Sequence, residues 1–220
     1  MSESSLKELK KLKKMAESSD ANDRHSFAIS LTNNDFEQAV INAIKTYKIE
    51  MVVMGTKGAT KAKSIFFGSN TVNIVKNNTY CPTLIIPEGL DFSKFEQIAF
   101  PTDFKRFYGD ELQVLKDLAS LYNSKIRIVH VNKEDNLSDA QNYNLAMLKA
   151  YLEDHRHSFH WMPDNARKTE EINDFILRQA VDMLVMINYK HSFFESIVNE
   201  PIIKNMGFSP KIPFMVIPAD

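Results

Sequence analysis

A glycine-rich segment in the first third of the chain has the residue types and spacing to bind phosphate. It follows the apolar run 51–54 and leads into a stretch with apolar residues at helical spacing, so it predicts a strand-to-helix loop. Such a loop offers backbone N–H groups and a helix N-terminus to an anion, and glycine lets the backbone approach closely. The predicted phosphate contacts, mostly through backbone, are Gly55, Thr56, Gly58, Gly68, Ser69 and Asn70.

Other residues are weaker candidates for a binding or catalytic site. Asp103 follows the predicted strand 97–100 and is either a ligand or a helix N-cap or loop carboxylate. His155, His157 and His160 lie close together, but no carboxylate stands beside them at a helical ligand spacing, so no metal site is predicted. Cys81 enters an apolar strand and is expected to be a small buried hydrophobe. No catalytic residue is nominated, because catalytic triads assemble in space rather than in sequence.

Composition limits the function classes. The chain has 220 residues, 44% of them apolar, with a formal charge of −1, so no excess positive field attracts nucleic acid or anionic lipid. The single cysteine excludes an intrachain disulfide. The N-terminus is polar and then Lys-rich, with Leu6, Leu9, Leu12 and Met15 at helical spacing behind a Ser5/Glu8 capping box. It predicts a helix with one buried face rather than a signal peptide, and the chain is expected to be cytoplasmic.

The chain contains an internal repeat. Residues 24–27 read Arg-His-Ser-Phe and recur at 156–159, and the apolar run that ends at Met54 recurs in a run that ends at Met186. The offset is 132 in both cases, since 156 − 24 and 186 − 54 are equal. The segment 81–87 is echoed by 212–218 at an offset of 131. A nearly constant offset over so many residues indicates a duplicated unit.

The two halves share a pattern of alternating strands and helices. In the second half the predicted elements are strands at 97–100, 125–131, 157–162, 183–187 and 213–217, with helices around 112–121, from Ser138 to Leu152, at 168–180, and in the loop region before the last strand. In the first half they are the N-terminal helix, strand 25–31, helix 35–48, strand 51–54, the helix after Gly68 and strand 83–86. This alternation predicts an α/β fold with a mostly parallel sheet covered on both faces.

The first half shows only the later part of that pattern. Subtracting the offset, Met1 corresponds to Lys133, so the counterpart of residues 96–132 would lie before the start of this chain. We therefore expect an incomplete first repeat at 1–88, a linker at 89–95 and a second repeat at 96–220. Strand 25–31 loses its expected neighbours and is predicted to rebuild its pairing, including with another chain.

The spacing Gly-x2-Gly-x9-Gly-Ser, after a strand and before a helix and Cys-Pro-Thr-Leu-Ile-Ile-Pro, resembles the universal stress protein family. Residues 100–104, Phe-Pro-Thr-Asp-Phe, are similar to the end of the family's first strand. The resemblance covers the whole chain as a tandem pair. It implies an open, Rossmann-like α/β sheet in which two repeats form a pseudo-dimer through their last strands, around 83–86 and 213–217. It also implies ATP held by the glycine loop, by an aspartate after the first strand, here Asp103, and by backbone after the second.

The second half departs from this pattern at its loop. Asn188, Tyr189, Lys190 and His191 stand where the first half has its first glycines, and Glu195 in place of Gly68 would bring negative charge towards a phosphate. The resemblance thus implies a stress-response or regulatory protein that binds ATP or another adenine nucleotide, with no metal apart from nucleotide-bound Mg, as a homodimer or intramolecular pseudo-dimer. Neither nucleic acid nor membrane is an expected partner. The alternatives are a scaffold or dimerisation module without nucleotide, and a slow ATPase.

Overall fold

The computed structural model describes residues 3–19, 22, 24–56, 68–91, 93–164, 168–189 and 212–219. Its strands are β1 (Val52–Gly55), β2 (Thr83–Ile86), β3 (Gln97–Pro101), β4 (Lys125–Val131), β5 (His157–Met162), β6 (Met183–Asn188) and β7 (Phe214–Pro218). Its helices are α1 (Glu3–Ser19), α2 (Phe36–Tyr47), α3 (Ser69–Asn77), α4 (Gln113–Tyr122), α5 (Asp139–Tyr151) and α6 (Lys168–Arg178), with short 3-10 turns at Asp110–Leu112 and Glu134–Asn136. The predicted α/β class is confirmed.

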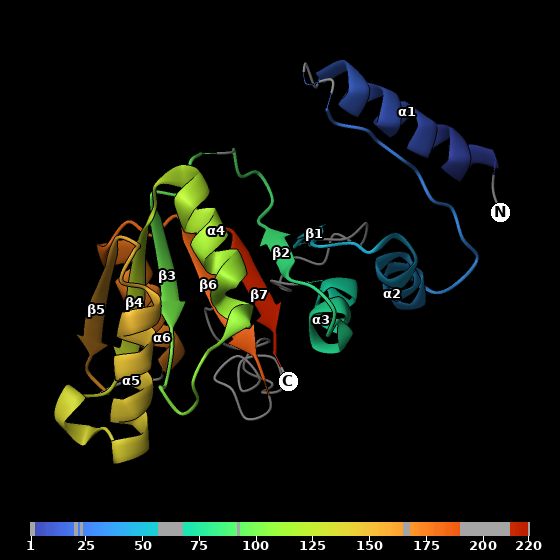
Figure 1. The fold of residues 1–220 in the computed structure, drawn as a ribbon. Coiled ribbons are helices and arrows are strands. Elements are labelled where there is room, and N and C mark those ends of the chain that lie inside the picture. The colour runs from blue at the N-terminus through green and yellow to red at the C-terminus, as the bar shows by residue number, and fades with distance from the viewer. Residues whose placement is uncertain are drawn as a thin grey trace.

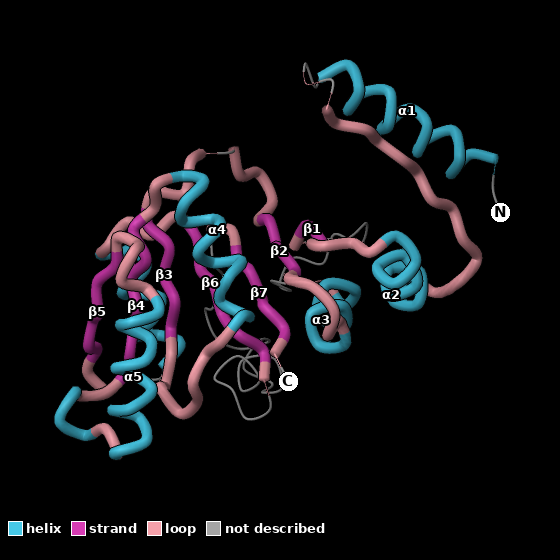
Figure 2. The backbone as a smooth tube through the Cα atoms, in the orientation of Figure 1, coloured by secondary structure: helices cyan, strands magenta, loops and turns pink. Residues whose placement is uncertain are grey.

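The described strands form one twisted sheet in the order β1-β2-β7-β6-β3-β4-β5, as Figures 1 and 2 show. Neighbouring strands are parallel except for β2 and β7, which pair antiparallel with Thr83 opposite Val216 and Ile85 opposite Phe214. These are the two strands that the sequence predicts to end the halves. Their pairing joins both halves into a single sheet.

Helices cover both faces of the second half's sheet (Figure 1). On one face, Leu115 of α4 and Leu148 of α5 pack over Ile98, Ile128 and the rest of one apolar cluster. On the other face, residues of α6 pack with Val75 of α3 in a second cluster. Because successive strand residues point to opposite faces, the near-continuous apolar strands 126–131 and 183–187 supply both clusters.

Local signals explain where several helices begin and end. Asp35 accepts a hydrogen bond from the Gln38 amide at the start of α2, and Lys48 ends that helix in the left-handed conformation with φ 51°. Ser138 and Gln141 form the reciprocal capping box predicted for α5. These contacts fix where both helices begin and where α2 ends.

Three features of the first half differ from expectation. Residues 25–31 are extended but are not a strand, because no described strand lies beside them to accept their backbone hydrogen bonds. Helix α1 begins at Glu3, ahead of the predicted Ser5/Glu8 capping box. It buries none of its residues, and Leu12 is 60% exposed, so the predicted buried face is wrong for this structure. Figure 1 shows α1 apart from the sheet, joined to α2 by the extended segment. The helix predicted before the last strand lies outside the described residues.

Candidate functional site

The two ends of the glycine loop lie against each other at the carboxyl end of β1. The Gly68 amide donates to the Thr56 carbonyl over 2.7 Å, and the Thr56 amide donates to the Ile86 carbonyl of β2 over 3.1 Å. The loop between them, which includes Gly58, lies outside the described residues. The structure therefore brings five of the predicted phosphate-binding residues to one strand-to-helix junction: Gly55, Thr56, Gly68, Ser69 and Asn70.

Helix α3 starts at this junction with its first amides free of a side-chain cap. Gly68 occupies the N-cap with φ −60° and ψ 148°, and no side chain there bonds an amide of the first turn. The amides of Ser69, Asn70 and Thr71 have no backbone acceptor within the helix, since the first intrahelical bond runs from Val72 to Gly68. The partial positive charge of a helix N-terminus therefore lies beside Thr56, an arrangement suited to an anion.

Thr71 is a residue of this junction that sequence reasoning missed. Its side chain is 3% exposed, and its hydroxyl donates to the Gly55 carbonyl over 3.0 Å. This bond ties the first turn of α3 to the last residue of β1, so it fixes the direction in which the helix N-terminus points. A buried threonine two residues after a Gly-Ser pair carries no sequence signal by itself, because threonine is common in both helices and loops.

The second half has its own candidate position, at the carboxyl ends of β3 and β6. The chain runs from β3 to β4 and β5 on one side and then crosses to β6 on the other side of β3. In open α/β sheets, ligands bind where the strand order reverses in this way. Asp103 follows β3 and Tyr189 follows β6, so both residues lie at this switch point.

The Asp103 carboxylate is already bonded within the protein. Its Oδ1 accepts the Lys105 amide over 3.0 Å and the Tyr189 hydroxyl over 3.1 Å, and its Oδ2 lies 3.8 Å from the Lys105 ammonium. The Arg106 guanidinium stacks 5.0 Å above the Tyr189 ring. The alternative reading of Asp103, a loop carboxylate, therefore agrees with its contacts. Tyr189 is the residue that sequence reasoning missed here.

Burial shapes the titration of the groups around this switch point. Burial raises the pKa of Tyr108 to about 12, and its hydroxyl lies 2.8 Å from Thr102 Oγ1. Burial, with the neighbouring Tyr108 and Asp103, also raises the pKa of Tyr189. Tyr189 therefore remains a hydrogen-bond donor to Asp103 through the neutral range.

An apolar and aromatic cluster lies directly beneath the loop that carries Asp103. Phe104, at φ 55°, packs against His130 and Trp161, with ring centroids 4.9 and 5.8 Å away. His130 Nδ1 lies 2.8 Å from the Thr102 carbonyl, to which it donates, and burial lowers the His130 pKa. Asn144 donates to the Phe104 carbonyl over 2.8 Å, so the loop is held from both β4 and α5.

Asn188 connects the two candidate positions. It is the last residue of β6, adjacent to Tyr189, and its side-chain amide donates over 3.3 Å to the Val75 carbonyl of α3. Helix α3 follows the glycine loop of the first half. A short chain of contacts thus runs from the glycine junction through α3 and Asn188 to the Asp103 side of the second half.

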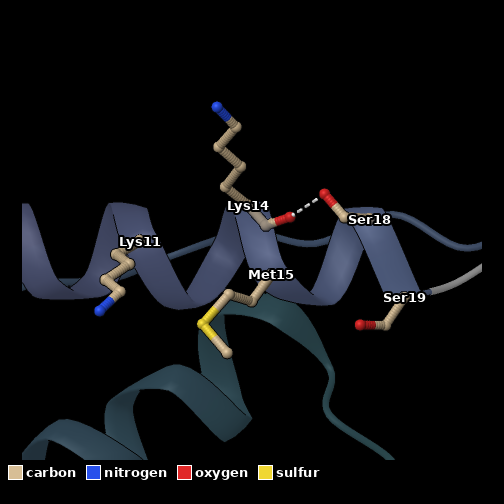
Figure 3. Close-up of a pocket in the computed structure, with 5 residues that line it drawn as sticks. All are labelled: Lys11, Lys14, Met15, Ser18 and Ser19. Atoms are coloured by element: carbon tan, nitrogen blue, oxygen red, sulfur yellow. Dashed lines mark hydrogen bonds between the residues drawn. The ribbon is translucent and has the colours of Figure 1, made fainter.

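The remaining candidates do not form a site among the described residues. The ring of His155 bonds Ser120, that of His157 bonds the His155 carbonyl, and that of His160 bonds Ser158. The described part of the chain contains no cluster of His, Cys, Asp and Glu suited to a metal ion. Cys81 is buried, its pKa is raised by burial, and Asn78 bonds its carbonyl, as expected for a packing residue. Figure 3 shows a pocket on α1, which is lined by Lys11, Lys14, Met15, Ser18 and Ser19.

Comparison with known proteins shows which family part of the chain resembles. Residues 1–87 match the model of the universal stress protein family. A universal stress protein from Archaeoglobus fulgidus is similar in structure, with a TM-score of 0.60 at 17% identity, over 81% of this chain and 66% of that chain. A putative universal stress protein from Pseudomonas aeruginosa has a TM-score of 0.61 at 10% identity, over 99% of this chain and 78% of that chain.

No match to a curated protein was found. The described helices include none that is long and apolar enough to cross a membrane. At such low identities the two solved structures establish the fold, and the family match rests on residues 1–87. Residues 1–87 are therefore similar to the universal stress protein family, and the chain shares its α/β fold with the two solved structures.

Proposed function

We propose that this chain is a stress-response or regulatory protein that binds ATP or another adenine nucleotide at the glycine junction of its first half. The observation that carries the proposal is the meeting of Thr56 and Gly68, over 2.7 Å, in front of the uncapped N-terminus of α3. The match of residues 1–87 to the universal stress protein family model supports the same interpretation.

The residues at the junction fit a phosphate group. The amides of Ser69, Asn70 and Thr71 have no acceptor among the described residues and could face an anion, and the Ser69 hydroxyl adds another donor. Bound ATP, with its own Mg, would supply the charge that these donors recognise. We assign no catalytic residue, so nucleotide binding rather than hydrolysis is the proposed activity.

The test compares two substitutions at one position. Asp and Asn both cap a helix well, so Gly68→Asp and Gly68→Asn are each expected to preserve α3. Only Asp brings a negative charge to the phosphate position, where like charges about 4 Å apart repel by about 1–4 kcal/mol. Calorimetric titration of ATP should show binding to the wild type and to Gly68→Asn, and at least about tenfold weaker binding to Gly68→Asp. Equal affinities for the two variants would contradict the proposal.

A second candidate function is a scaffold or dimerisation module that binds no nucleotide. It is favoured by the switch point of the second half, where Tyr189 bonds the Asp103 carboxylate that a ligand would need. Absence of heat and of chemical-shift change at millimolar ATP would support the scaffold. A slow ATPase is distinguished from both by phosphate release that is lost in Gly68→Asp and retained in Gly68→Asn.

A further inference from the structure

A small cavity lies where the two halves of the chain meet, between the carboxyl end of β2 and the amino ends of β3, β6 and β7. Five of the residues that line it are apolar: Ile86, Leu90, Phe95, Ile212 and Pro213. Its volume is about 140 Å³. An apolar cavity of about 150 Å³ is large enough to bind benzene. This cavity therefore has the size and the lining for one small apolar group.

The walls of the cavity are held in place by contacts of their own. The Phe95 ring packs edge-on against Tyr122, with ring centroids 5.2 Å apart, and the Phe95 carbonyl accepts the Ser124 hydroxyl. The Pro213 carbonyl accepts the Leu184 amide over 3.0 Å. A pocket whose walls are fixed before a ligand arrives loses less conformational entropy on binding. These contacts therefore favour a preformed binding site.

Two polar residues complete the lining, Ser93 and Asp182. Asp182 Oδ2 accepts the backbone amides of Glu96 and Gln97, over 2.9 and 2.8 Å. These two bonds fix the carboxylate, while its Oδ1 has no hydrogen-bond or ion-pair partner among the described residues. Hydrogen bonds between an ammonium group and a carboxylate are roughly twice as strong as those between neutral groups. Asp182 therefore suits a ligand that carries an ammonium group.

The charge around the cavity also favours a cation. Segment 88–96, which connects β2 to β3 in Figure 1, contributes three of the lining residues. This segment has three carboxylates and one ammonium group, on Glu88, Asp91, Glu96 and Lys94. With Asp182 added, carboxylates outnumber ammonium groups four to one. This excess of negative charge attracts a cation, repels an anion and gives a neutral ligand no electrostatic gain.

We propose that this cavity binds a small monoamine, whose apolar body fills the cavity and whose ammonium group pairs with the Asp182 carboxylate. The cavity and the proposed nucleotide site are neighbours, because Ile86 lines the cavity and its carbonyl accepts the Thr56 amide over 3.1 Å. They are nevertheless separate, since none of the predicted phosphate-binding residues lines the cavity. The inference therefore does not depend on nucleotide binding.

The test titrates benzylamine into the full chain and follows the chemical shifts of the backbone amides. Benzylamine joins a benzene ring to an ammonium group, and benzyl alcohol is its uncharged counterpart. Benzylamine should shift the amides of Leu90, Ser93 and Gln97 with a dissociation constant of about 1 mM or below, an ordinary affinity for so small a ligand. Benzyl alcohol should bind about threefold or more weakly, and the anion phenylacetate about tenfold or more weakly, because neither can pair with Asp182.

Two matched variants assign the preference to one carboxylate. Asp182→Asn keeps an oxygen that can accept the Glu96 and Gln97 amides, but it should weaken benzylamine binding by about threefold or more. Glu96→Gln removes an exposed carboxylate outside the lining and should change the affinity by less than about twofold.

Three results would overturn the proposal. They are the absence of a saturable shift at Leu90, Ser93 and Gln97 up to about 20 mM benzylamine, equal affinities for benzylamine and benzyl alcohol, and unchanged affinity in a folded Asp182→Asn variant. If that variant does not fold, the comparison of benzylamine with benzyl alcohol in the wild type decides the question by itself.

Discussion

The Tyr189 hydroxyl donates to Asp103 Oδ1 over 3.1 Å, joining the carboxyl ends of β6 and β3 at the point where the strand order reverses. The Arg106 guanidinium stacks on the same tyrosine ring. The phenol therefore occupies one hydrogen-bonding position of the Asp103 carboxylate. The second half is thus bonded to itself at its switch point, while the first half keeps an uncapped helix N-terminus.

Tyr189→Phe should destabilise the chain by about 1 kcal/mol, because it removes one hydrogen bond to a carboxylate that is still partly solvated. Asp103→Asn tests the same contact from the other side. In a double-mutant cycle by urea denaturation, the two changes should be non-additive by about 0.5–1.5 kcal/mol. Additive effects would mean that the Tyr189–Asp103 bond contributes nothing in solution.

The proposed site predicts that Asp103 does not contribute to nucleotide affinity. Asp103→Ala should leave the dissociation constant for ATP within about twofold, because the carboxylate is bonded to Tyr189 and Lys105 and lies in the half without a glycine loop. Calorimetry should also give one nucleotide per chain. A stoichiometry of two, or a large loss of affinity in Asp103→Ala, would place a nucleotide in the second half.

Alkaline pH should destabilise the fold through Tyr108. Burial raises its pKa from 10.0 to about 12, so between these values the folded state holds a proton that the unfolded state has released. The stabilisation is fully present below pH 10 and is lost as the pH rises towards 12, by up to about 2 kcal/mol. Urea midpoints at pH 9 and 11 should differ less in Tyr108→Phe than in the wild type. Tyr143→Phe, at an exposed position on α5, is the control for loss of a phenol.

Acid should destabilise the fold through His130. Burial lowers its pKa below 6.5, so the unfolded state binds the proton more readily; the stability is present above pH 6.5 and falls as the pH drops through the lowered value. The ring lies 5.4 Å from Trp161, the only tryptophan, whose fluorescence reports the transition. His130→Asn keeps a donor for the Thr102 carbonyl and should flatten the pH dependence between 5 and about 6.5. An unchanged slope would mean that the pH dependence comes from another group, such as His160. Burial lowers the pKa of His160 as well.

Much of the fold could be predicted because its signals are local or periodic. The apolar runs 51–54 and 183–187 predict buried strands, the Ser138/Gln141 pair predicts the start of α5, and the glycine spacing places Gly55 and Gly68 at one junction. Tyr189 could not be predicted, because its contact with Asp103 arises only when β6 and β3, 86 residues apart, become neighbours. The periodic leucines of α1 predict that one face packs against an apolar surface. They do not show whether that surface belongs to the described residues, and α1 buries none of its own residues there.

The contrast between α5 and α1 gives the last prediction. Leu148 of α5 is 1% exposed within the apolar cluster, so Leu148→Ala should cost about 2–5 kcal/mol by leaving a cavity. Leu12 of α1 is 60% exposed, so Leu12→Ala should change the free energy of unfolding by less than about 0.5 kcal/mol in the isolated chain. Chemical denaturation of the two variants measures both values. A cost above 1.5 kcal/mol for Leu12→Ala would show that α1 packs against a surface in solution, whereas a small cost means that its apolar stripe is available to a partner.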